Sequence, residues 1–156
     1  MFTMTKNKIN KILIVGYGNI ALRHYRIINS LLPNAKIKFL RSNPKKILNK
    51  KNQIASFVEV KKFLPDLAVL ANPSSKHIEI SFKLLKIKIK YFFIEKPISN
   101  KFLNAKKFLK HCQKNNINVF VGYNLKYCKS LTKIKTLIDN KYINNIFLVT
   151  VETGFN

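Results

Sequence analysis

The sequence predicts an α/β fold built on a doubly wound parallel sheet. Short apolar runs that suit buried strands alternate with stretches whose apolar residues recur at helical spacing. The first apolar run leads through a Gly-x-Gly turn directly into a helical stretch. Because strands and helices alternate throughout, neighbouring strands should run parallel, with helices on both faces of the sheet.

The glycine turn is the first candidate for a binding site. Residues 12–15 predict a buried strand, which Gly16 and Gly18 interrupt before a helix begins. Gly16 permits a tight turn, and Gly18 has no side chain that could block a pyrophosphate. The N–H groups that open the helix, at Asn19 and Ile20, would point at that anion, which the helix dipole also favours. The turn predicts dinucleotide binding, with a plain strand-to-helix turn as the alternative.

The remaining elements continue the same alternation. Proline, asparagine, serine and glycine separate the apolar runs from the helical stretches. A short basic helix or loop is expected at 45–51, and Ser99 should cap the fourth helix. The expected strands are 12–15, 36–40, 53–56, 67–71, 91–94, 118–121 and 146–151. The expected helices are 19–32, 57–64, 77–86, 101–115 and 128–138. The residues expected to face the sheet are Ile20, Ile27, Ile28 and Leu31 in the first helix and Phe102, Ala105, Phe108 and Leu109 in the fourth.

The size and composition of the chain suit one folded domain. Its 156 residues should comprise a basic leader at 1–10, a nucleotide-binding domain at 11–140 and a further segment at 141–156. No apolar run approaches the roughly 18 residues of a membrane span. The two cysteines form no C-x-x-C pair and the histidines stand alone, so no metal site is expected. Free thiols without an export signal indicate the cytoplasm.

The formal charge of +24 comes almost entirely from lysine. Of the 30 Lys and Arg residues only three are Arg, and the lysines are spread over every segment. Proteins that recognise nucleic acids usually use Arg for bidentate contacts to bases and phosphates. Non-specific attraction to polyanions is expected at low salt, but dedicated nucleic-acid recognition is disfavoured.

The end of the second expected strand bears on the choice of cofactor. About 20 residues after the glycine turn, NAD-binding folds usually carry an Asp or Glu that binds the ribose 2′-hydroxyl. Here the strand ends in Arg41 and Ser42, which offer a cation and a hydroxyl. This pair suits the 2′-phosphate of NADP, although a solvated Arg in a turn is the alternative. We therefore expect NADP, with NAD possible.

Four motifs in order resemble the nucleotide-binding half of the glucose-fructose oxidoreductase/inositol dehydrogenase (Gfo/Idh/MocA) family. The triplet Glu95-Lys96-Pro97 after an apolar strand is the most specific of them. The resemblance covers residues 10 to 152. The four motifs are Gly16-Tyr-Gly-Asn-Ile-Ala21 followed by Arg23-His24, Asn72-Pro73 with His77, Glu95-Lys96-Pro97, and Val121-Gly-Tyr-Asn124.

The resemblance implies NAD(P)-dependent hydride transfer to or from a sugar, sugar derivative or cyclitol. It implies that Lys96 is the catalytic residue, contacting the nicotinamide ribose and the reacting hydroxyl, and that Glu95 orients it. His77 is either part of the cofactor cleft or simply a cap or surface residue, and His24 should only pack or bond locally. The expected cofactor-binding residues are Gly16, Gly18, Asn19, Ile20, Arg41, Ser42, Asn72, Pro73, His77, Glu95, Lys96 and Asn124.

Members of this family carry a second α/β domain that holds the substrate, and this sequence departs from that pattern. Residues 146–151 would form only the first strand of that second sheet, and no carboxylate–histidine pair follows the sixth strand. The chain is therefore expected to bind the cofactor but to be incomplete as a catalyst. It would be a truncated product or one half of a split enzyme with a separately encoded C-terminal domain, with a homo-oligomer possible, or it would be a non-catalytic nucleotide-binding module.

Overall fold

The computed structural model describes residues 9–41, 52–146 and 148–150. These residues fall into two units that divide between Gly122 and Tyr123, and each unit is described by itself. Within the described residues, no helix is long and apolar enough to cross a membrane.

The first unit is built on a six-stranded sheet in the order β3-β2-β1-β4-β5-β6, and every neighbouring pair is parallel. The direction of the strand order reverses between β1 and β4, and ligands of such sheets bind outside the carboxyl ends of strands at this point. The predicted parallel sheet is confirmed. The strands are β1 (Lys11–Val15), β2 (Lys36–Leu40), β3 (Gln53–Ile54), β4 (Leu67–Leu70), β5 (Tyr91–Ile94) and β6 (Asn118–Val121).

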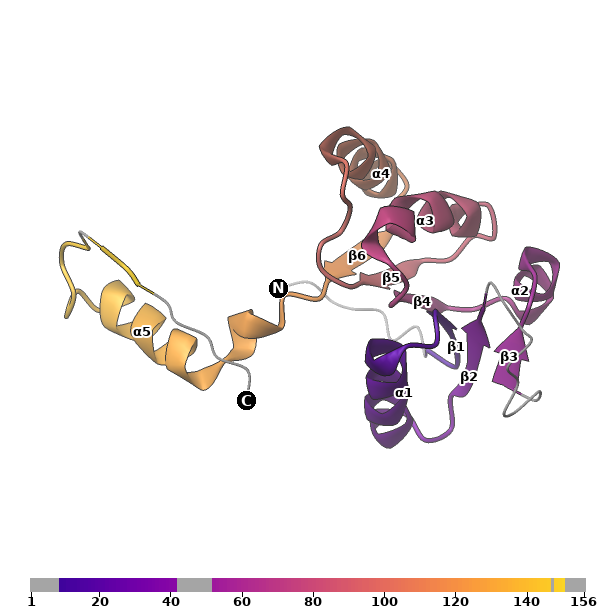
Figure 1. Ribbon diagram of the computed structural model, residues 1–156, viewed down its shortest axis with the longest axis horizontal. Helices are drawn as coiled ribbons and strands as arrows, with labels where there is room; N and C mark the ends of the chain where they lie inside the picture. Colours follow the sequence, from indigo (N-terminus) through magenta and orange to yellow (C-terminus); the bar gives the residue numbers. More distant parts are fainter. Residues whose placement is uncertain (1–8, 42–51, 147, 151–156) are drawn as a thin grey trace. The chain divides into compact units, whose positions relative to one another are not determined.

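Helices cover both faces of this sheet (Figure 1). Alternate residues of β1 point to opposite faces, so Ile12 and Ile14 belong to one apolar cluster and Leu13 and Val15 to the other. The first cluster is covered by α1 (Asn19–Leu31). The second is covered by α2 (Phe57–Phe63), α3 (His77–Leu85) and α4 (Phe102–Lys114).

The predicted sheet-facing side of α1 is wrong at three of its four residues. Ile20 and Ile27 are 45% and 46% exposed, and Leu31 is 73% exposed. The helix instead packs along Ala21, Tyr25 and Ile28, whose spacing of four and three residues follows one helical face. Ala21 is fully buried because its small side chain lets the helix approach the strand closely, so counting bulky residues misplaces the face.

The predicted start of α4 is also wrong. Ser99 does not cap the helix: its hydroxyl accepts a hydrogen bond from the N–H of Lys101 at 3.0 Å, and the helix begins only at Phe102. Because Phe102 occupies the first turn, it is 77% exposed, and Leu109 is 41% exposed. The buried face is Ala105, Phe108 and Cys112, of which the first two were predicted.

The strand β3 is shorter than predicted because its last expected residues begin the next helix. Ser56 leaves the strand to form a capping box with Glu59. The Ser56 hydroxyl accepts a hydrogen bond from the N–H of Glu59 at 3.2 Å, and the Glu59 carboxylate accepts one from the N–H of Ser56, also at 3.2 Å. The backbone N–H groups of Ala55 and Ser56 both donate to the Glu59 carboxylate, and these two hydrogen bonds lower the pKa of Glu59.

The second unit contains a short 3-10 helix (Asn124–Tyr127) and α5 (Lys129–Asp139). No residue of α5 is buried, and Leu131 and Ile134 are 43% and 47% exposed. The strand expected at 146–151 is not seen, since residues 146 and 148–150 have no regular secondary structure and 147 and 151 lie outside the described residues. A strand needs a hydrogen-bonded neighbour, and no described segment pairs with this one.

Candidate functional site

The glycine turn joins the carboxyl end of β1 to α1 in a conformation that requires Gly16. Its φ of +103° lies in the region that side chains rarely adopt, and a Cβ there would lie 2.9 Å from the carbonyl oxygen of Ala71. Gly16 therefore brings the glycine turn into close contact with the chain that follows β4. In addition, the N–H of Gly16 donates to the carbonyl of Leu40 at 3.0 Å, which ties the turn to the end of β2.

Gly18 leaves open space at the start of α1. It is the N-cap residue of this 13-residue helix, and no side chain caps the helix there. A Cβ built on Gly18 would meet no heavy atom within 4 Å. Asn19 and Ile20, the first residues of the helix, are exposed. An uncapped helix start with open space before it can accept an anion, because the first N–H groups of a helix lack intrahelical partners.

Arg41 follows β2 and packs against the glycine turn. Its guanidinium lies 4.5 Å from the ring centroid of Tyr17, the residue between the two glycines. The backbone N–H of Arg41 donates to the carbonyl of Ile54 at 3.1 Å, and Nη1 of its side chain donates to Oε1 of Gln53 at 3.4 Å. The structure thus places a cation beside the glycine turn. Ser42, the other residue predicted here, lies outside the described residues.

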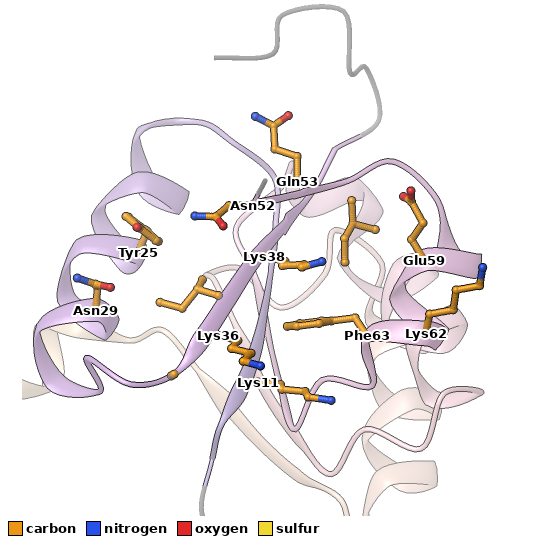
Figure 2. Close-up of a pocket in the computed structure, with 13 residues that line it drawn as sticks. Lys11, Tyr25, Asn29, Lys36, Lys38, Asn52, Gln53, Glu59, Lys62 and Phe63 are labelled. Carbon is orange, nitrogen blue, oxygen red and sulfur yellow. The ribbon is translucent and has the colours of Figure 1, made fainter. Parts of the chain in front are cut away.

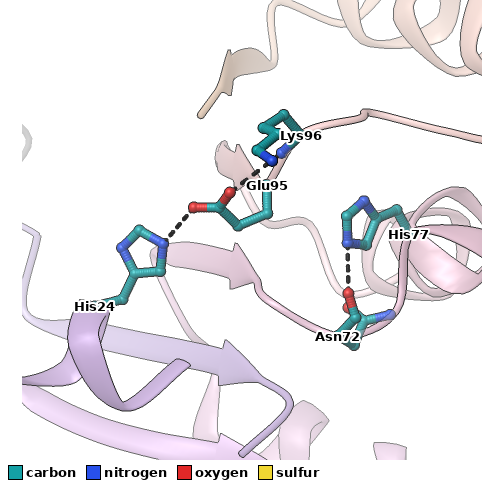
Figure 3. A network of polar contacts seen from close by, with 5 residues as sticks. All are labelled: His24, Asn72, His77, Glu95 and Lys96. Atoms are coloured by element: carbon teal, nitrogen blue, oxygen red, sulfur yellow. Dashed lines mark hydrogen bonds and ion pairs between the residues drawn. The ribbon is translucent and has the colours of Figure 1, made fainter. Parts of the chain in front are cut away.

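Glu95, at the carboxyl end of β5, is held by a residue that the sequence analysis left out of the site. Nε2 of His24 on α1 lies 2.7 Å from Oε1 of Glu95, and both side chains are about one-fifth exposed (Figure 3). The other carboxylate oxygen accepts a hydrogen bond from the N–H of Lys96 at 3.3 Å. A Cβ on Gly122, directly after β6, would lie 3.1 Å from Oε1 of Glu95. The carboxylate therefore sits between α1 and the end of β6.

The structure bears out the packing that was expected of His24, but its hydrogen bond is not local in sequence. The two partners are 71 residues apart in sequence, and the imidazole also makes an edge contact with Phe93, with ring centroids 5.1 Å apart. One signal could have indicated this position. His24 follows Ala21 by three residues, so it lies on the buried face of α1 once that face is assigned correctly.

His77, the first residue of α3, is buried with 1% exposure. Its Nε2 lies 2.7 Å from the carbonyl oxygen of Asn72, and its Nδ1 lies 3.0 Å from that of Pro97. The alternative that His77 is a surface residue is therefore wrong, because the ring is buried and contacts the backbone of two loops. The adjoining side chain of Asn72 donates from Nδ2 to the carbonyl of Pro73 at 3.2 Å. Its Oδ1 is buried without a hydrogen-bond partner in the described part of the chain.

The predicted residues of the first unit gather at the carboxyl edge of the sheet. They follow β1, β2, β4 and β5, whose parallel register brings their ends together. Lys96 and Pro97 are exposed there, and the peptide bond between them is cis. Asn124 begins the 3-10 helix of the second unit, so it stays a prediction. Among the described residues, no three His, Cys, Asp or Glu side chains gather as metal ligands.

A separate cavity of about 780 Å³ lies beside β2 and includes none of the predicted site residues (Figure 2). Lys11 and Lys36, the first residues of β1 and β2, line it, so it begins at the opposite ends of the strands. Ammonium groups of Lys11 and Lys38 lie 5.9 and 5.2 Å from the ring centroid of Phe63 on its wall. We give this cavity no part in the dinucleotide site, because the glycine turn is not among its lining residues.

Comparisons with known proteins agree with this architecture. The WlbA dehydrogenase from Bordetella pertussis, solved with NADH and UDP-GlcNAcA, matches with a TM-score of 0.79 and 20% identity, over 90% of this chain and 42% of that one. A myo-inositol 2-dehydrogenase from Lactobacillus plantarum matches with a TM-score of 0.74 and 20% identity, over 89% and 43% of the two chains. A scyllo-inositol dehydrogenase from Lactobacillus casei, solved with NAD(H) and scyllo-inositol, matches with a TM-score of 0.73 and 23% identity, over 88% of this chain and 43% of that one.

The chain thus spans less than half the length of these dehydrogenases. A comparison with curated protein sequences gave no significant match. The family model that describes the GFO_IDH_MocA oxidoreductases, with an NAD-binding Rossmann fold, matches residues 10–123. That range includes the glycine turn, Asn72-Pro73 and the Glu95-Lys96-Pro97 triplet. The chain belongs to the GFO_IDH_MocA oxidoreductase family and comprises its NAD-binding Rossmann domain.

Proposed function

We propose that this chain binds NADP at the carboxyl edge of its sheet, as the cofactor-binding part of an oxidoreductase that acts on a sugar, sugar derivative or cyclitol. The observation that carries the proposal is the uncapped start of α1, open in front of Gly18, with Arg41 packed on the same turn. The similar dehydrogenases were solved with NADH or NAD(H), so the preference for NADP rests on Arg41 and Ser42, at the position where NAD-binding folds usually carry an Asp or Glu.

The residues present fit a dinucleotide. The open space before Gly18 would be closed by any side chain, as expected where a pyrophosphate approaches the backbone. Oδ1 of Asn72 is a buried acceptor without a donor in the described residues, and a ribose hydroxyl would supply one. Both features lie at the carboxyl ends of adjacent strands, β1 and β4, where the strand order reverses.

The residues at this edge of the sheet would each bind a different part of the cofactor. The N–H groups of Asn19 and Ile20 would bind the pyrophosphate, and Arg41, with Ser42, would bind the 2′-phosphate through charge-assisted hydrogen bonds. Asn72 and Pro73 would line the cleft. The bound nicotinamide supplies the hydride chemistry.

Lys96 would carry the proton of the reacting hydroxyl. Its side chain is exposed, and its backbone N–H is bonded to Glu95, which His24 holds in place. The substrate itself would be held by protein beyond this unit, because hydride transfer needs a near-attack geometry that a cofactor domain alone does not impose.

Titration of the purified chain with NADPH, followed by nicotinamide fluorescence and by calorimetry, tests the proposal. We expect saturable binding to a folded sample, with weaker binding of NADH. Circular dichroism on the same sample establishes that it is folded. A folded chain that binds neither cofactor would refute the assignment.

Replacing Arg41 with Asp should reverse the cofactor preference. The change removes a cation from the 2′-phosphate and places a carboxylate where a ribose 2′-hydroxyl can donate to it, so the ratio of the NADPH and NADH affinities should change on the order of 100-fold. Arg26→Asp makes the same change in net charge at an exposed position of α1 and should leave the ratio unchanged. An unaltered ratio in the Arg41 variant would remove the NADP assignment.

A further inference from the structure

We propose that His77 is a positioning residue that fixes the nicotinamide end of the cofactor site by tying two loops together. The inference rests on the function proposed above and concerns the chain after β4 and the chain after β5. The imidazole lies between them, 2.7 Å from the carbonyl oxygen of Asn72 and 3.0 Å from that of Pro97. With 1% exposure, the ring has almost no surface left with which to contact a cofactor directly.

The loops that His77 joins carry the residues proposed for the nicotinamide end. The first contains the side chain of Asn72, with its unpartnered buried oxygen. The second contains Lys96, directly before the carbonyl that His77 contacts. The two carbonyls lie 5 residues before and 20 residues after His77, so a single side chain links the two loops beyond the last paired residues of β4 and β5.

The position of the ring is fixed from its own helix as well. The backbone N–H of His77 donates to the carbonyl of Ser74. The hydroxyl of Ser81 donates to the backbone carbonyl of His77 at 2.8 Å. These contacts hold the first turn of α3, so the imidazole nitrogens are presented at a defined place. A neutral ring has one N–H and can donate to one loop at a time, whereas the protonated ring can donate to both.

A purely space-filling role makes a different prediction from a positioning role. If His77 only filled the core, an aromatic ring of similar size would replace it, and any loss of stability would weaken all ligands alike. If it positions the two loops, losing its nitrogens removes the hydrogen-bond partner of their carbonyls and releases the nicotinamide end, while the glycine turn and Arg41 keep the adenosine end intact.

Two ligands separate these cases. NADPH spans the whole site, whereas adenosine 2′,5′-bisphosphate reaches only the adenosine end near Arg41. In His77→Phe and His77→Gln we expect the dissociation constant of NADPH to rise about tenfold, which corresponds to the loss of one hydrogen bond. The bisphosphate should bind each variant within about twofold of the wild type, and Gln, whose amide group can still donate a hydrogen bond, should lose less NADPH affinity than Phe. His111→Gln, at an exposed histidine in the last turn of α4, is the matched control and should alter neither ligand.

Equal weakening of both ligands, or unchanged NADPH binding, would overturn the inference. A wild-type chain that binds neither ligand would refute the proposed function instead, so the two failures are distinguishable. If the variants do not fold, nitrogen NMR of the histidine rings in the wild-type chain decides. NADPH should shift the His77 ring resonances and the bisphosphate should not, and resonances that respond to neither would overturn the positioning role.

Discussion

Replacing Gly18 with valine should abolish NADPH binding and leave the fold intact. Gly18 has φ −79° and ψ −178°, an extended conformation that valine adopts readily, and a Cβ there would meet no heavy atom within 4 Å. The fold therefore accommodates the new side chain. A bound pyrophosphate would not, because the isopropyl group would occupy the space in front of the first N–H groups of α1. We expect the dissociation constant to rise by roughly 100-fold or more, about 3 kcal/mol.

A matched control separates this effect from a general change at a helix start. Lys101 is the N-cap of α4, which like α1 has 13 residues and no side-chain cap. Lys101→Val places the same side chain at the same position of a helix outside the predicted site, and it should leave NADPH binding unchanged. The Gly18 variant should lose about 1 kcal/mol of stability at most, because valine is a poorer N-cap residue than glycine, and the Lys101 variant should unfold close to the wild type; thermal unfolding measures both. Wild-type affinity in the Gly18 variant would contradict the placement of the pyrophosphate.

The sequence predicted the sheet well because the signal for a buried strand is local. A continuous apolar run between polar breaks identifies β5 at 91–94 to the residue, and alternating lysine and apolar residues identify β2 at 36–40. The side of each helix that packs against the sheet was predicted less well. The buried stripe of α1 passes through Ala21, and no count of large apolar residues gives weight to alanine, which is buried because it is small.

The loops of the site were predictable, but the contacts within them were not. Polar and glycine residues after parallel strands must meet at one edge, so the positions of Gly16, Asn72 and Glu95 follow from the strand order. The bond between His24 and Glu95 joins residues that are 71 apart, and no periodicity or spacing encodes it. The same is true of His77, whose partners are backbone carbonyls that carry no sequence signal.

Replacing Gly16 with alanine should destabilise the domain strongly. At φ +103° the backbone is strained for any residue with a Cβ, and the added methyl would lie 2.9 Å from the carbonyl oxygen of Ala71 and 3.1 Å from the backbone nitrogen of Asn72. Both neighbours are backbone atoms, so relief requires the chain after β4 to shift. We expect a loss of about 2–4 kcal/mol in the free energy of unfolding, from the backbone strain and the overpacking together. Urea unfolding followed by circular dichroism measures it.

The same substitution at Gly18 provides the comparison, because both glycines lie in one turn and only one is crowded. Gly18→Ala should alter the free energy of unfolding by less than about 1 kcal/mol, since its Cβ would enter open space. Equal stability of the two variants would show that Gly16 does not need its positive φ. Because the displaced segment carries Asn72, whose carbonyl contacts His77, Gly16→Ala should also weaken NADPH binding in the fraction that remains folded. In this way a single backbone contact between the ends of β1 and β4 couples the stability of the domain to the geometry of its proposed cofactor site.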